Sequence, residues 1–249
     1  MTQPLVDQPR SPMDPNRPTA LIAGVLLICA TVASLAGTAL EQPVLSGADY
    51  LTKVSGSATQ IAAGGLLELI AAGTSVGIAI SLYPMLRKRV AGLALASVVF
   101  RTIEAVMYTG AAASLLSLVM ISQKIAQAAT SERSSLQLVG DSLMGMRQEF
   151  TLAGVFAFSV GALMYYFAFY QSRLIPRWLS GWGIVGVLLI LAACVSALFS
   201  GRPITTYATL VLPIAVQEMV LAVWLTTKGF SEQRPVVMNT AIRRPEVMA

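Results

Sequence analysis

Apolar residues of this chain come in long blocks, without the alternation of a half-buried strand. Short polar segments separate six apolar blocks, at residues 19–40, 61–86, 92–121, 148–170, 178–199 and 207–227. An α-helix needs about twenty predominantly apolar residues to cross a bilayer, and each block is long enough. The pattern therefore predicts an all-α fold, an integral membrane bundle of six transmembrane helices.

The ends of the chain differ in composition from this central part. Residues 1–17 contain four prolines among polar residues, and residues 231–249 are polar, basic and contain proline. Such segments have too little apolar surface to form a packed core. We expect one membrane domain at residues 18–230, flanked by disordered cytoplasmic tails at residues 1–17 and 231–249.

Two of the polar segments show signs of local structure. In the loop expected at residues 41–60, Asp49 and Lys53 stand at i and i+4, which favours a short surface helix. In the loop at residues 122–146, four apolar residues recur at helical spacing: Leu136, Val139, Leu143 and Met146. This spacing predicts an amphipathic helix at the membrane surface that runs into the fourth span.

Lysine and arginine are divided unequally between the two sides of the predicted bundle. With the N-terminus inside, eleven of them fall on the inner side and five on the outer side, and Arg101 lies within the membrane. Cytoplasmic loops carry the excess of positive charge, so both termini are expected in the cytoplasm. An aromatic belt is then expected near the inner interface: Tyr83, Tyr165, Tyr166, Tyr170, Trp178 and Trp182.

Composition excludes several classes of function. Charged residues make up only 12% of the chain, and the net charge of +5 arises from residues that flank the apolar blocks. No basic run is interleaved with aromatic residues, so we expect no nucleic-acid binding. The chain contains no histidine, which removes histidine-ligated metals and the common hydrolytic triads. We expect Cys29 and Cys194, both inside predicted spans, to be small buried residues and not a disulfide.

Four ionisable residues lie deep inside the predicted spans: Glu68, Arg101, Glu104 and Glu218. A charge at this depth costs at least ~2.5–3.5 kcal/mol, so each residue needs a partner inside the protein. Arg101 and Glu104 are three residues apart and therefore share a helix face. We expect the four residues to converge in one layer near the bilayer midplane.

Other polar residues surround this predicted centre. Ser97 and Tyr108 lie on the same stripe as Arg101, and Gln217 precedes Glu218. The candidate ligand- or proton-binding site therefore comprises seven residues: Glu68, Ser97, Arg101, Glu104, Tyr108, Gln217 and Glu218. Arg147 and Glu149, near the outer end of the fourth span, are expected to be interfacial anchors.

The pattern leaves different functions open. In the first, the Arg–Glu centre binds or translocates a small solute, an ion or a proton, with Arg101 as anion partner or counter-ion and the glutamates as proton acceptors. In the second, the buried charges are a structural clamp in a non-catalytic assembly or regulatory module. An intramembrane enzyme is the least supported class, because no nucleophile or metal motif accompanies the carboxylates. We expect no cofactor, no metal and no catalytic residue, and the pattern specifies no oligomeric state.

Several runs together resemble one known family: GGLLELIAAGTSVGIAISLYPMLRK, GLALASVVFRTIEAVMY, YQSRLIPRWLSGWG and PIAVQEMVLAVWLTTKGF. They are similar to the bacterial multi-pass proteins of domain-of-unknown-function family 4386, and the likeness covers about residues 18–230. The resemblance implies a multi-pass protein of a bacterial inner or plasma membrane, with the lipid bilayer as its main partner. It implies no activity, ligand or catalytic residue.

Overall fold

A computed structural model describes residues 16–231, and nearly all of both predicted tails lies outside this range. The described residues form helices and no strand. The elements in chain order are α1 (Arg17–Leu45), α2 (Tyr50–Gly56), α3 (Ala58–Gln127), α4 (Thr130–Ser172), α5 (Arg177–Ser200), the short 3₁₀ helix η1 (Ile204–Tyr207) and α6 (Ala208–Thr227).

Five helical segments in this range, the last of them η1 together with α6, are long and apolar enough to cross a membrane. Each carries large apolar side chains that point out of the bundle, such as Val32 on α1 and Leu212 on α6, which are 57% and 62% exposed. A water-soluble surface does not carry so continuous an apolar cover. The chain is therefore a multi-pass membrane protein.

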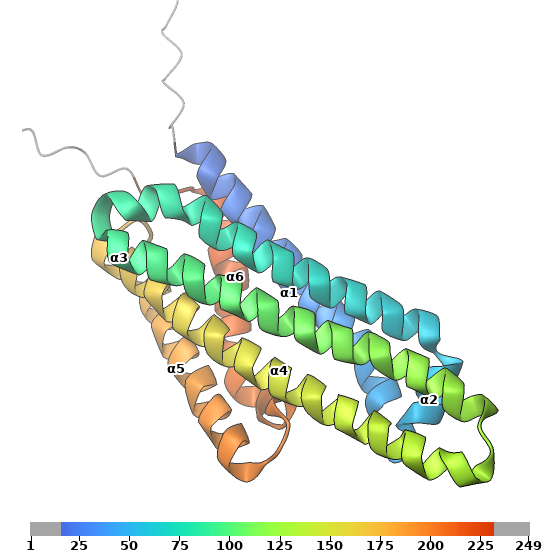
Figure 1. Cartoon of the computed structure of the whole chain (residues 1–249). Helices are drawn as coiled ribbons and strands as arrows, with labels where there is room; N and C mark the ends of the chain where they lie inside the picture. The colour runs from blue at the N-terminus through green and yellow to red at the C-terminus, as the bar shows by residue number, and fades with distance from the viewer. Residues whose placement is uncertain (1–15, 232–249) are drawn as a thin grey trace, which may run out of the picture.

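Helix α3 is 70 residues long and folds back on itself (Figure 1). At Val90 the backbone leaves helical geometry, with φ −143° and ψ 64°. The break follows the basic residues Arg87, Lys88 and Arg89, between the second and third predicted spans. Below, the first arm of α3 denotes residues 58–89 and the second arm residues 91–127.

The second arm of α3 and the start of α4 extend past the other long helices (Figure 1), and their apolar residues form a small core with α2. The amphipathic segment at residues 136–146 is helical and runs into the fourth predicted span, as expected, because both belong to α4. Tyr50 of α2 donates a hydrogen bond of 2.8 Å to Asp141 of α4. Burial and this carboxylate raise the pKa of the Tyr50 hydroxyl, so it remains a donor.

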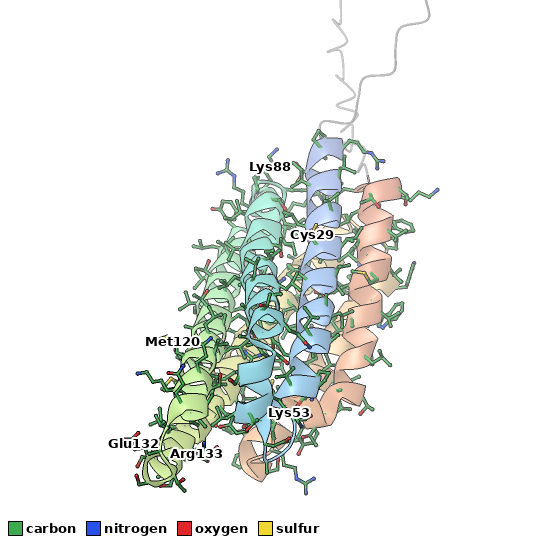
Figure 2. All side chains as sticks on the ribbon, turned by 90° about the vertical axis from the view of Figure 1, so that its right-hand side faces the viewer. Cys29, Lys53, Lys88, Met120, Glu132 and Arg133 are labelled. Atoms are coloured by element: carbon green, nitrogen blue, oxygen red, sulfur yellow. The ribbon has the colours of Figure 1, made fainter. Side chains whose placement is uncertain are left out.

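The two ends of the bundle are polar (Figure 2). Lys88 lies at the end where α1 begins, which we call the basic end. Lys53, Glu132 and Arg133 lie at the opposite end, which we call the α2 end. As the i, i+4 spacing predicts, Lys53 pairs with Asp49 at 2.9 Å, and this hydrogen bond lowers the pKa of the Asp49 carboxyl.

The main apolar core corrects two expectations. Tyr165 and Tyr166 were expected in an interfacial belt, but they are 1% and 0% exposed and lie inside the bundle. Trp178, at 57%, is exposed as expected of such a belt. Cys194 is buried, whereas Cys29 is exposed on α1, and both are free thiols.

Candidate functional site

The second arm of α3 carries a buried ion pair. Arg101 and Glu104 lie one turn apart, with Arg101 Nη1 3.1 Å from Glu104 Oε2, and their side chains are 3% and 5% exposed. Ser75 on the first arm donates a hydrogen bond of 2.9 Å to the same carboxylate oxygen. The fold-back at Val90 makes this contact possible, because it places the two arms side by side (Figure 1).

Arg101 is held by packing as much as by charge. Its side chain runs past Gly161 of α4, where an added Cβ would stand 3.2 Å from Arg101 Cδ. Its guanidinium lies 4.8 Å from the centre of the Phe158 ring and 5.9 Å from that of Tyr165. The Nε atom has no hydrogen-bond acceptor within residues 16–231, and Nη1 contacts Glu104 as an ion pair without the geometry of a hydrogen bond. Arg101 therefore keeps donors that a further group could use.

A cavity of about 200 Å³ lies against this ion pair. Residues from α1, α3, α4, α5 and α6 line it, and most of them are apolar. Its polar or charged lining comprises Thr31, Ser34, Ser75, Arg101, Glu104, Tyr108 and Glu218. Drug-sized sites occupy ~300–1,000 Å³, so this cavity suits an ion, water or a small solute.

Glu218 faces the cavity from α6 and is partly exposed to it. The Tyr165 hydroxyl donates to its carboxylate at 3.3 Å. Within the described chain no lysine or arginine forms an ion pair with Glu218. Arg101 lies near enough to interact electrostatically with Glu218 but forms no ion pair with it, so the Glu218 carboxyl group can still bind a proton or a cation.

Gln217 is completely buried and is used differently from Glu218. Its side-chain oxygen accepts a hydrogen bond from Tyr166, and its side-chain nitrogen donates one of 3.0 Å to the Leu179 carbonyl. These bonds join α4, α5 and α6. Ser97 is also buried, and neither it nor Gln217 lines the cavity.

A second buried ionic cluster lies nearer the α2 end and joins three helices. Arg147 of α4 pairs with Glu41 of α1, and its Nη1 atom donates to Glu68 of α3 at 2.9 Å. The same nitrogen donates to the Ala111 carbonyl at 3.3 Å. The side chains of these three ionisable residues are at most 17% exposed. Below, the Arg147 cluster denotes Glu41, Glu68 and Arg147.

The Arg147 cluster corrects three expectations. Glu68 pairs with Arg147 instead of Arg101, so the four intramembrane charges do not form one ion-paired group. Arg147 is 12% exposed and binds two carboxylates, unlike an interfacial anchor. Glu41 was placed in a loop, yet it lies inside α1, because the helix continues past the apolar block to Leu45.

Sequence reasoning also missed Ser75, Tyr165 and Tyr166 as neighbours of the predicted centre. The sequence analysis places the two tyrosines in the interfacial belt, and Ser75 is not among the seven predicted site residues. The adjacent tyrosines could have indicated a polar contact inside the bundle, since a buried tyrosine hydroxyl needs a hydrogen-bond partner. The polar residues of α6 could supply such partners.

The family model described as a domain of unknown function (DUF4386) matches residues 22–229. The chain belongs to this family. The match confirms the resemblance carried by the sequence runs, and it covers every residue of the cavity and of the Arg147 cluster in this DUF4386 protein. No curated protein and no solved structure matches the chain.

Proposed function

We propose that this DUF4386 protein binds or translocates a small solute, an ion or a proton in the cavity beside Arg101 and Glu104. The observation that carries the proposal is the cavity itself, which exposes charged groups near the middle of apolar helices. Residues used only to fix helix order would pack without such a space. Intramembrane charges that face a cavity mark ion and proton pathways in membrane proteins.

The charges around the cavity divide into two roles. Arg101 is the counter-ion of Glu104 and holds donors for an anionic group or water. Glu218 forms no ion pair within the described residues, although Arg101 interacts with it electrostatically, and it is the acceptor for a proton or a cation. Tyr108 also lines the cavity and lies one turn beyond Glu104 on the second arm of α3.

The alternative is a structural clamp in a membrane assembly or regulatory module. The hydrogen bonds of Gln217 favour it, because Tyr166 and the Leu179 carbonyl satisfy that side chain without contact to the cavity. A clamp requires no exchange of protons or solute. A measurement of proton or solute flux across a membrane therefore distinguishes the two functions.

We also propose that the two arms of α3 are separate spans, so that six helices cross a bacterial plasma membrane with both termini in the cytoplasm. The unequal distribution of lysine and arginine supports this orientation. The basic residues at the α3 fold-back would then lie on the cytoplasmic side with Arg17 and Lys228.

Cysteine labelling of intact cells tests this orientation. In a background in which Cys29 and Cys194 are replaced by serine, we expect Lys53→Cys and Arg133→Cys to react with a membrane-impermeant maleimide. Lys88→Cys and Lys228→Cys should react only after the cells are permeabilised. Labelling of the Lys88 and Lys228 positions alone in intact cells would reverse the orientation.

Replacement of Glu218 by glutamine tests the proposed function. The amide keeps the shape of a protonated carboxyl, so we expect the melting temperature in detergent to change little. In vesicles that contain the variant, proton flux driven by a potassium diffusion potential should fall to the level of empty vesicles. The matched control is Glu149→Gln, which alters an exposed glutamate on α4 and should keep wild-type flux. Wild-type flux no greater than that of empty vesicles, or a Glu218→Gln variant with wild-type flux, would remove the proton-translocating form of the proposal.

A further inference from the structure

The Arg147 cluster contains a buried oxygen atom without a partner. Glu41 is 5% exposed, and its Oε2 atom pairs with Arg147. Its Oε1 atom is inaccessible to solvent and has no hydrogen bond within residues 16–231. The backbone at Gly64 makes room for this carboxyl group, since an added Cβ there would stand 2.6 Å from Oε1.

The groups around Glu41 leave its charge only partly balanced. Arg147 on α4 is the nearby cation and Glu68 on α3 the nearby anion. On α2, Tyr50 donates to Asp141 and Lys53 pairs with Asp49, so neither compensates Glu41. One guanidinium thus faces two carboxylates, and two carboxylates that share a buried site do not both ionise at low cost.

We propose that the Arg147 cluster is a second proton-binding site, in which Glu41 takes up the proton. A lone pair of Oε1 forms the new O–H bond, and the carboxylate becomes a neutral carboxylic acid while Arg147 stays paired with Glu68. On release the proton passes to water, and Glu41 returns to its ionised state. The site binds a proton and no larger ligand, because Gly64 and Arg147 enclose the carboxyl group.

Tyr108 connects this site to the cavity. Glu68 and Ser75 are seven residues apart on the first arm, and Ser75 is the hydrogen-bond partner of Glu104. The Arg147 cluster and the ion pair of Arg101 therefore lie ~10 Å apart along the helix. Tyr108 lies one turn beyond Glu104 on the second arm and interacts electrostatically with both Glu104 and Glu68. Its hydroxyl can accept a proton from one side while it donates its own to the other. This connection, unlike proton binding by Glu41, rests on the proposed function.

Infrared difference spectroscopy of the purified protein in lipid tests proton binding directly. When the pH is lowered, the wild type should show the C=O stretching band of a buried carboxylic acid. Glu41→Gln should remove this band, and Glu68→Gln should shift it, because Glu68 shares the same arginine. The exposed control Glu149→Gln should leave it unchanged.

Further variants separate this site from the cavity. The Glu41 band should persist in Glu218→Gln, so a failed flux experiment would overturn the proposed function without touching the Arg147 cluster. Tyr108→Phe should retain the band and reduce proton flux at least tenfold if the tyrosine connects the two sites. Wild-type flux in Tyr108→Phe would remove the connection. A spectrum unchanged in both Glu41→Gln and Glu68→Gln would overturn the proton-binding site itself.

Discussion

Replacement of Arg101 by alanine is expected to lower the free energy of unfolding by about 3–5 kcal/mol, the usual effect of breaking a buried ion pair. The variant leaves Glu104, which is 5% exposed on its side chain, with Ser75 as its hydrogen-bond partner. It also removes the guanidinium from the faces of Phe158 and Tyr165. Unfolding by sodium dodecyl sulfate, followed by circular dichroism, measures the change.

A second substitution identifies the cause of this loss. Glu104→Gln in the Arg101→Ala background removes the uncompensated carboxylate, so it should restore part of the stability. The loss in the single variant should also be greater at alkaline pH, where Glu104 must take up a proton to remain buried. Equal losses in the single and double variants would show that packing against the aromatic rings, and not charge, explains the effect.

The sequence predicted the fold better than the site. Apolar blocks identify each long helix, because backbone groups in lipid must be hydrogen-bonded within the helix. The break near Val90 follows from the basic residues beside it, which interrupt an otherwise apolar stretch. Helix ends were less predictable. Helix α1 continues to Leu45, past the last residue of its apolar block, because packing at the α2 end holds its final turn.

Within the site, a contact between residues close in sequence could be predicted, whereas a contact between distant residues could not. The contact between Arg101 and Glu104 follows from a spacing of three residues on one helix. The contact of Arg147 with Glu41 joins residues 106 positions apart, and no periodicity relates them. Each of these two residues stands at the margin of an apolar block, where solvated charge is the ordinary interpretation. Tertiary packing buries both, and only the arrangement of α1, α3 and α4 shows it.

The largest effect outside the cavity is expected from Arg147→Met, which keeps the aliphatic part of the side chain and removes its charge. Glu41 and Glu68 would then face each other without a cation, so the free energy of unfolding should fall by about 3 kcal/mol or more. The matched control is Arg133→Met, on an exposed part of the same helix, which should change stability by less than about 0.5 kcal/mol.

Addition of Glu41→Gln and Glu68→Gln to Arg147→Met should recover most of the loss, because neutral groups replace the whole ionic cluster. The same triple variant should leave the ion pair of Arg101 intact, since the two clusters lie ~10 Å apart along α3. The effects of Arg101→Ala and Arg147→Met should therefore add to within ~0.5 kcal/mol. A large departure from additivity would instead show that the two clusters are energetically coupled. A proton path through Tyr108 does not require such coupling, because it acts on the rate of proton transfer and not on the free energy of unfolding.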